Sequence, residues 1–395
     1  MQDSALKALC DQVQQAYDSK SGLSIQGSGS KAFLCQTASS KANLKASPKE
    51  ELKEIVDTTD YRGIVQYEPT ELVITAKAGT PISEVEQALD EQGQMLAFEP
   101  PQLGGNDVVT GGGSFNGTVG GMVASGLAGP RRPWSGGVRD YVLGTSIING
   151  TGEYLRFGGQ VMKNVAGYDV SRLMVGSMGR LGVLTDVSLK VQPKPECQQY
   201  YRFESMPAEL FGMLQKVFMK MTPITGVSHD GHYAHVRLEG RQKTLVEFAR
   251  LQNWLFEEPL QLELEQYWLQ VRHHQHAVFQ SEGRGEGEGG GECEGAGEVW
   301  QLSLPKWSEL SSSQLASLNL PYLMDWAGAR YWLKADMSHF EQLKEYVQSL
   351  KGHLRIYRGA QAIQYPELSP AIFKLHQNLK QAYDPAGILN PLSVL

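Results

Sequence analysis

Two segments in the N-terminal half are rich in glycine and serine and have the composition of anion-binding turns. Residues 25–31 read IQGSGSK. The backbone N–H groups of such a turn can converge on an anion because no bulky side chain blocks the approach, and Lys31 adds a positive charge. Residues 120–132 read GGMVASGLAGPRR, so small residues permit the close approach of a flat ligand or a diphosphate. Either segment taken alone is also compatible with a purely structural turn.

A dinucleotide-binding fingerprint of the Rossmann type is one alternative for the first segment, since Gly27, Gly29 and Ala32 have its spacing. That fold needs a helix directly after the glycines and an acidic residue about 20 residues later, at the end of a second strand. Residues 33–44 read FLCQTASSKANL, which is poor in helix formers, and no such acidic residue follows. We therefore reject the Rossmann interpretation.

A metal site is the second alternative, because two groups of histidines are closely spaced. The groups are His229, His232 and His235, and His273, His274 and His276. However, residues 232–238 have the pattern of a strand, in which residues three apart face opposite sides. The sequence therefore predicts no metal site.

The elements that position the glycine-rich segments follow an α+β pattern with several short strands. Residues 1–20 predict an amphipathic helix, whose apolar side is formed by Leu6, Leu9, Val13 and Tyr17. Glycines at 150 and 152 separate two apolar runs and predict a hairpin. The other expected elements are strands at 23–26, 71–79, 141–149, 153–157 and 181–191, a helix at 81–93, and a helix that begins near Pro48.

Pro193 and Pro195 mark a boundary, beyond which helices and strands alternate in a second α+β region. Its expected helices cover 207–221 and 241–256, and its expected strands include 232–238 and 329–335. Residues 281–298 read SEGRGEGEGGGECEGAGE, a low-complexity segment that cannot bury apolar area. We expect this segment to form a solvated surface loop.

Composition restricts the class of protein. A chain of 395 residues should divide into two or three domains. The net charge of −7 argues against a general nucleic-acid or anionic-membrane surface. The four cysteines are scattered and form no Cys-x-x-Cys pair, so we expect neither an iron–sulfur cluster nor a disulfide framework. No signal peptide or run of about 20 apolar residues is present. We expect a cytoplasmic protein that could sit peripherally at the inner membrane through a partner.

Residues 158–191, GGQVMKNVAGYDVSRLMVGSMGRLGVLTDVSLKV, carry a resemblance to a known family. This run resembles the FAD domain of the vanillyl-alcohol-oxidase-like flavoproteins. Within that group, residues 120–144 and 157–169 are similar to the FAD-binding subunit of glycolate oxidase. The similarity continues at VRLEG, VRHHQHAVF and DWAGARYWL and ends at AYDPAGILNP (382–391). It therefore covers nearly the whole chain.

The resemblance implies an α+β fold with a two-subdomain PCMH-type FAD-binding domain at 1–193, divided at about residue 60. An α+β cap domain would follow at 194–352, and a C-terminal segment at 353–395 would pack back on the FAD domain. Residues 104–117 and 281–298 would be insertions relative to the family.

The resemblance also implies which residues hold FAD, which we expect to be bound noncovalently. The loop at 27–31 would hold the diphosphate with backbone amides, while 120–126 would approach from the other side. The implied cofactor-binding residues are Gly27, Ser28, Gly29, Ser30, Lys31, Gly120, Gly121, Ala124, Ser125, Gly126, Tyr168, Asp169, Gly176, Ser177, Gly179, Gly182 and Val183. Lys163 and Arg131 or Arg132 would stabilise a reduced, anionic flavin or form surface ion pairs.

Three functions remain open at this stage. In the first, the chain is the FAD-binding subunit of a multi-subunit glycolate oxidase. It then supports oxidation of glycolate to glyoxylate beside a catalytic flavoprotein subunit and passes electrons to an iron–sulfur subunit. In the second, it is a free-standing FAD-dependent 2-hydroxy-acid dehydrogenase with His274 or His276 as base. In the third, it is a structural subunit without active flavin. The intact glycine motifs argue against the third, and the resemblance favours the first.

Overall fold

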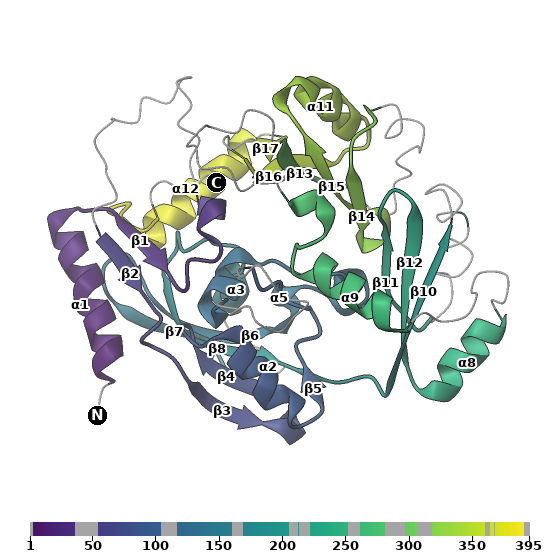
Figure 1. Ribbon diagram of the computed structural model, residues 1–395. Helices are drawn as coiled ribbons and strands as arrows, with labels where there is room; N and C mark the ends of the chain where they lie inside the picture. Colours follow the sequence, from purple (N-terminus) through teal and green to yellow (C-terminus); the bar gives the residue numbers. More distant parts are fainter. Residues whose placement is uncertain are drawn as a thin grey trace, which may run out of the picture. The chain divides into compact units, whose positions relative to one another are not determined.

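The chain divides into two compact units, each with its own sheet and core (Figure 1). The first unit comprises Met1–Ala128, Gly136–Lys194 and Leu368–Leu395, and the second comprises Gly129–Ser135 and Pro195–Glu367. The computed structural model describes residues 3–35, 54–103, 117–159, 169–204, 212, 222–251, 261–280, 297–305, 318–359, 364–366 and 368–390.

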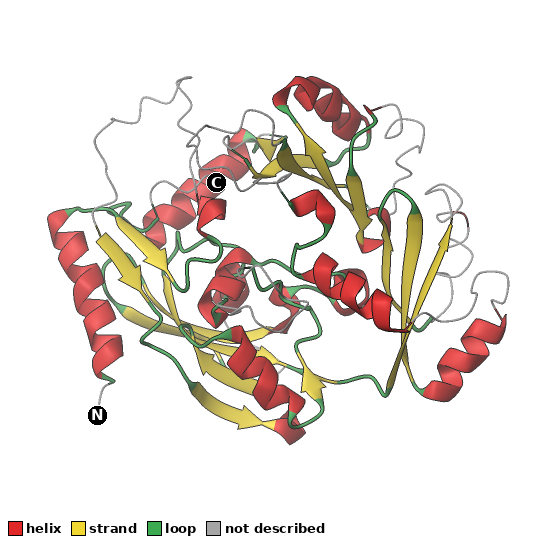
Figure 2. Ribbon diagram, in the orientation of Figure 1, coloured by secondary structure: helices red, strands yellow, loops and turns green. Residues whose placement is uncertain are grey.

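The first unit contains a five-stranded antiparallel sheet in the order β3-β4-β8-β6-β7, drawn in yellow in Figure 2. Its strands are β3 (Ile64–Glu68), β4 (Val73–Lys77), β6 (Val142–Ile148), β7 (Tyr154–Gly158) and β8 (Val183–Lys190). The three central strands are rich in β-branched residues that are buried along much of their length, as expected where side chains pack on a pleated surface.

Helices of the first unit complete its core against this sheet. In α2 (Ile82–Asp90), the buried residues Ile82, Val85 and Leu89 recur at helical spacing and so form one apolar face. α3 (Val119–Ser125) packs on β4 and β8. The helix lies close to the residue that follows β4, because a Cβ at Gly120 would lie 2.8 Å from the Cβ of Ala78. The short elements of this unit are β5 (Gln94–Met95), α5 (Val138–Tyr141), α6 (Val170–Leu173), β9 (Gln192–Pro193) and two 3-10 turns, η1 (Ala32–Cys35) and η2 (Pro69–Glu71).

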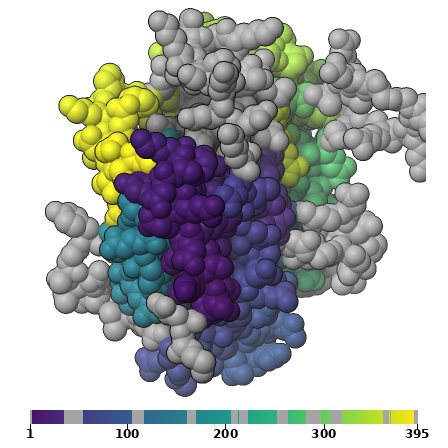
Figure 3. Space-filling view, turned by 90° about the vertical axis from the view of Figure 1, so that its left-hand side faces the viewer, coloured from purple at the N-terminus to yellow at the C-terminus, as the bar shows by residue number. Residues whose placement is uncertain are grey.

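A smaller core in the same unit joins the two ends of the described chain. It lies among α1 (Ser4–Ser19), the parallel pair β1 (Leu23–Gln26) and β2 (Glu54–Asp57), and residues 388–389. Leu9, Val13 and Ala16 are the buried face of α1, which forms the dark purple column in Figure 3. α12 (Pro370–Tyr383) leads to residues 388–390, where Leu389 pairs with Leu23 in parallel.

The second unit is built on an eight-stranded sheet in the order β10-β12-β11-β14-β15-β13-β16-β17. Its strands are β10 (Cys197–Glu204), β11 (Ile224–His229), β12 (Tyr233–Gly240), β13 (Glu298–Ser303), β14 (Tyr322–Asp325), β15 (Arg330–Ala335), β16 (His353–Arg358) and β17 (Gln364–Tyr365). Its other elements are α4 (Arg132–Ser135), α8 (Gln242–Leu251), α9 (Gln261–Arg272), α11 (Phe340–Ser349), η3 (Ala277–Phe279), η4 (Trp326–Gly328) and η5 (Met337–His339). Its core is centred on Trp300, Tyr331 and Leu333, all fully buried.

The structure confirms the expected α+β fold, and the strands, hairpin and N-terminal helix form within a few residues of their expected bounds. The expected helices near Pro48 and at 207–221, and most of the insertions at 104–117 and 281–298, lie outside the described residues. The segment expected at 353–395 is divided between the units, because β16 pairs with β13 whereas α12 belongs to the first unit. In the described part of the chain, no helix is both long and apolar enough to cross a membrane.

Candidate cofactor-binding site

A cavity of about 520 Å³ lies in the first unit, between segments that are far apart in the sequence. One wall is the end of β1 with the loop that follows it, and a second is α3 with the residue before it. A third comes from the turn that begins at Met178 and from Asn390 near the C-terminus. The two glycine-rich segments recognised in the sequence therefore face one cavity.

The loop after β1 offers main-chain donors to this cavity. The N–H groups of Ser28, Gly29 and Ser30 donate to no other group among the described residues. Gly29 has a φ of 73°, a conformation that glycine adopts without steric strain. Three consecutive unused donors form the kind of concave main-chain surface that binds anions.

Lys31 supplies the charge of this wall. The described residues that line the cavity include no other ionisable side chain. Its Nζ is buried and has no hydrogen-bond partner among the residues that the structure describes. Burial lowers the pKa of Lys31 to about 8. A buried ammonium without a partner is unfavourable by itself and becomes favourable when an anion enters.

The α3 wall contributes shape rather than hydrogen-bond donors. The N–H of Gly120 donates to the Ala78 carbonyl at 2.8 Å, and the N–H of Gly121 donates to Thr118 Oγ1 at 3.2 Å. These two N–H groups already have acceptors within the protein. The glycines therefore contribute the absence of a side chain, which lets a ligand come close to the backbone of α3. The same threonine also stands against Gly27, where a Cβ would lie 2.4 Å from Thr118 Oγ1.

The third wall is held against α3 by main-chain hydrogen bonds. The N–H groups of Gly176 and Met178 donate to the carbonyls of Val123 and Ala124, at 3.0 and 2.9 Å. Gly179 follows in a left-handed conformation with φ of 72°. These bonds fix the turn beside the C-terminal end of α3.

Eleven of the residues expected to bind the cofactor line the cavity. They are Gly27, Ser28, Gly29, Ser30, Lys31, Gly120, Gly121, Ala124, Ser125, Gly179 and Gly182. Gly126, Gly176 and Ser177 support the α3 wall or its turn, Val183 is buried in the core beside α1, and Asp169 caps α6. Tyr168 lies outside the described residues. The structure thus brings eleven of the seventeen residues to one cavity, and a binding role for all seventeen stays a prediction.

Ten further lining residues were not expected from the motifs. They are Ser24, Ile25, Gln26, Ala32, Thr58, Ala78, Thr118, Met178, Leu184 and Asn390. Most are ordinary strand or turn residues with no recognisable pattern. Asn390 is the exception, because it lies within AYDPAGILNP, which already carried the family resemblance.

The cavity suits a ligand that carries one anionic group and is otherwise largely neutral. Its free amides and its lysine gather at one wall, while small or apolar side chains form most of the other two. A dinucleotide with a diphosphate between two flat ring systems has this distribution of charge. The residues present therefore fit FAD.

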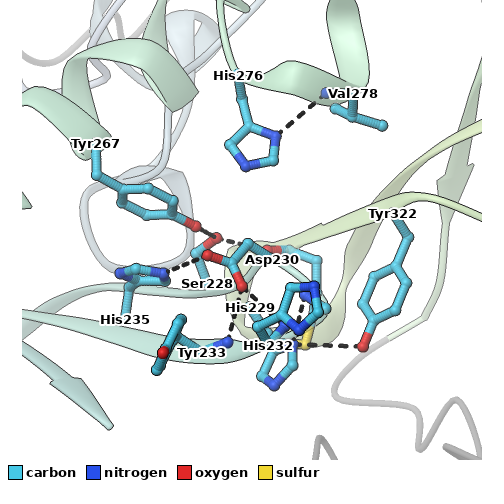
Figure 4. A network of polar contacts seen from close by, with 12 residues as sticks. Ser228, His229, Asp230, His232, Tyr233, His235, Tyr267, His276, Val278 and Tyr322 are labelled. Atoms are coloured by element: carbon cyan, nitrogen blue, oxygen red, sulfur yellow. Dashed lines mark hydrogen bonds and ion pairs between the residues drawn. The ribbon is translucent and has the colours of Figure 1, made fainter. Parts of the chain in front are cut away.

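Four of the six clustered histidines, His229, His232, His235 and His276, lie in a polar and aromatic network in the second unit (Figure 4). His235 Nε2 lies 2.9 Å from Asp230 Oδ2, and its ring stacks on Tyr267 with 3.6 Å between centroids. Burial acts to raise the pKa of Asp230, but hydrogen bonds from His235 and two backbone N–H groups outweigh it and hold the pKa well below its ordinary value. Among the described residues, no group of three metal-ligating side chains is assembled.

The two arginines after α3 have different partners within the second unit. Arg131 is buried and paired with Glu239, its Nη2 lying 2.6 Å from Oε1, so its charge is compensated there. Arg132 is exposed and lies over the ring of Trp326, with its Cζ 4.3 Å from the ring centroid. The role of either arginine toward a flavin stays a prediction. Lys163 lies outside the described residues.

Comparisons with known proteins agree with this site. A family model described as FAD binding domain matches residues 9–158. The glycolate oxidase subunit GlcE of Escherichia coli (strain K12) is 40% identical over 385 residues, which cover 98% of this chain and 96% of that protein. The glycolate oxidase subunit GlcD of Bacillus subtilis (strain 168) is 35% identical over 136 residues, 34% of this chain and 27% of that protein.

A solved structure of alkyldihydroxyacetonephosphate synthase superposes with a TM-score of 0.63 at 15% identity, covering 98% of this chain and 76% of that one. This likeness shows a shared fold. Fold, cavity and family match together define an FAD-dependent oxidoreductase of the PCMH-type class. Within that class, the chain belongs to the family of the glycolate oxidase subunit GlcE.

Proposed function

We propose that this chain is the FAD-binding subunit of a multi-subunit glycolate oxidase. The observation that carries the proposal is the cavity whose main-chain donors at 28–30 and buried Lys31 ammonium have no partner among the described residues. The likeness to a glycolate oxidase subunit over 98% of the chain supports the choice of reaction. In this proposal the complex oxidises glycolate to glyoxylate.

Each wall of the cavity has a distinct part in the proposal. The N–H groups of residues 28–30 and the ammonium of Lys31 bind the diphosphate, while the glycines of α3 allow the ligand to lie against the sheet. When bound, FAD supplies the two-electron acceptor chemistry. The described residues that line the cavity include no histidine or cysteine to form a covalent bond to the flavin, which supports noncovalent binding.

The likeness to the glycolate oxidase subunit GlcE over nearly the whole chain supports a subunit of a complex over a free-standing dehydrogenase. Each of the two histidines considered as bases has a structural contact at one ring nitrogen. His274 Nδ1 lies 2.8 Å from the Tyr357 hydroxyl, and its ring stacks on Phe279. His276 Nδ1 accepts the N–H of Val278 at the start of η3. Glycolate oxidation is then assigned to a partner flavoprotein subunit, and onward electron transfer to an iron–sulfur subunit.

An anaerobic reduction experiment tests this division of labour. The chain purified alone should be yellow, release FAD on heating, and keep its flavin oxidised when glycolate is added. The complex isolated from the native host should contain two further subunits, and its flavin should be bleached by glycolate. Bleaching of the isolated chain by glycolate or D-lactate would instead establish a free-standing dehydrogenase. A colourless chain that binds no added FAD would establish a structural subunit.

A further inference from the structure

Asn390 lies at the point where two walls of the cavity come together. It is 7% exposed and lines the cavity, although it is 363 positions from the start of the glycine loop at Gly27. Its contacts show that it connects these walls.

The side-chain amide of Asn390 bridges β1 and the turn at 178–182. Its Oδ1 accepts the N–H of Ile25 at 2.8 Å, and its Nδ2 donates to the Met178 carbonyl at 2.6 Å. Ile25 lies two residues before Gly27, and Met178 lies directly before Gly179. A single planar group thus sets the spacing between the diphosphate loop and the opposite wall. Aspartate lacks the donor, so asparagine suits both contacts.

The segment that carries this amide is itself firmly held. The N–H of Leu23 donates to the Ile388 carbonyl at 2.7 Å, and the N–H of Asn390 donates to the Leu23 carbonyl at 2.9 Å. The buried Asp384 accepts the N–H groups of residues 388 and 389 and pairs with Lys380 Nζ at 2.6 Å. These hydrogen bonds hold the backbone of residues 388–390 in place independently of the two contacts that the Asn390 side chain makes with the cavity walls.

We infer that Asn390 is a positioning residue for the cofactor, joining the diphosphate loop to the 178–182 turn at the distance that FAD requires. The inference rests on the proposed binding of FAD in this cavity. A residue that fixes this spacing raises the affinity for the cofactor, because the walls need not be ordered when the ligand enters.

The substitution Asn390→Gly isolates the side-chain contacts. Asn390 has a φ of 41°, in the left-handed region, so alanine would add backbone strain whereas glycine does not. Asn149→Gly is the matched control. Asn149 is 8% exposed in the same unit, and its Oδ1 accepts the N–H groups of Thr151 and Glu153 at 3.0 Å. It does not line the cavity, so its loss removes comparable hydrogen bonds at a distance from the ligand.

The measurements are the Kd for FAD, by titration of the apoprotein, and the urea unfolding of each apoprotein. Both substitutions should destabilise the apoprotein. Asn390→Gly should also raise the Kd by about tenfold or more, through faster release, whereas Asn149→Gly should leave it within about twofold of wild type. At saturating FAD, the Asn390→Gly variant should regain the wild-type flavin spectrum.

A Kd unchanged in Asn390→Gly, or raised equally in Asn149→Gly, would overturn the inference. If Asn390→Gly does not fold, Asn390→Asp decides the question. It retains the acceptor for Ile25 but places a carboxylate against the Met178 carbonyl, so wild-type affinity in that variant also overturns it. Failure of the proposed function is distinct, because the wild-type chain itself would then bind no FAD.

Discussion

Replacing Lys31 by methionine should stabilise the apoprotein while weakening its binding of FAD. Methionine retains much of the aliphatic length and removes only the buried charge. Burial lowers the pKa of Lys31 to about 8, against 10.5 for a solvated lysine. Because each pH unit corresponds to about 1.4 kcal/mol, keeping the proton on Lys31 at neutral pH costs the apoprotein on the order of 3 kcal/mol.

The pH dependence of the free energy of unfolding follows from the pH at which Lys31 loses its proton in the folded and in the unfolded chain. The folded apoprotein releases the Lys31 proton near pH 8, whereas the unfolded chain keeps it until about pH 10.5. Between these values the unfolded state binds more protons, so the free energy of unfolding rises with pH. The stability advantage of Lys31→Met should therefore be largest below pH 8 and fall to about half by pH 9.5.

Urea unfolding of the apoproteins between pH 7 and 9.5 tests the predicted gain in stability. The control is Lys7→Met, at an exposed position on α1. Calorimetric titration with FAD at pH 8.5, in two buffers of different ionisation enthalpy, tests the predicted loss of affinity and of proton uptake. Wild type should take up a proton as the diphosphate enters, and Lys31→Met should not. The variant should bind FAD about tenfold to a hundredfold more weakly. Equal apoprotein stability at pH 7, or unchanged affinity, would refute the reasoning.

Three further outcomes are expected. Gly27→Ala should greatly reduce FAD binding in a flavin titration, because its Cβ would lie 2.4 Å from Thr118 Oγ1 and displace that wall; wild-type affinity would contradict this. Glu239→Gln should lower the free energy of unfolding of the second unit by about 3 kcal/mol, measured in urea, because Arg131 stays buried without its carboxylate. Burial lowers the pKa of His235 below its ordinary value of 6.5. As the pH falls, the histidine of the unfolded chain is protonated before that of the folded chain, so the free energy of unfolding decreases. In His235→Gln, the urea midpoint should therefore depend less on pH between pH 7 and 5.

The structure changes the reason why Gly27 matters. The sequence indicated that small residues here leave the backbone N–H groups open to an anion. In the structure, Gly29 is the residue of this loop with a positive φ, 73°, and Gly27 is not among the residues with positive φ. Gly27 is required because Thr118 stands against it. Motif spacing located the turn correctly but could not reveal a contact with a residue 91 positions away.

Arg131 and the clustered histidines illustrate a limit of reasoning from residue type. In sequence, an arginine beside a glycine-rich run suggests a site for negative charge, and histidine spacing alone resembles a metal site, an alternative that the strand pattern of residues 232–238 already argued against. In the structure, Arg131 meets Glu239 from β12, and His235 meets Asp230 and Tyr267. The partner of Arg131 is 108 positions away, and His235 is contacted by both a neighbour in its own hairpin and a residue of α9, so the folded chain decides whether such a side chain is available to a ligand.

The cofactor was implied by the family resemblance. The residues themselves determined the α+β fold, the position of most described strands and helices, and the glycine segments at 27–31 and 120–126. These depend on local periodicity, turn chemistry and backbone freedom, which are encoded within short stretches of chain. Tertiary structure alone decided that Lys31 is buried without a described partner, that the amides of the α3 glycines are already used, and that Asn390 joins two walls. The first depends on desolvation, the second on the close packing of Gly120 against Ala78, and the third on hydrogen bonds to residues 365 and 212 positions away, so only the folded chain brings these groups together.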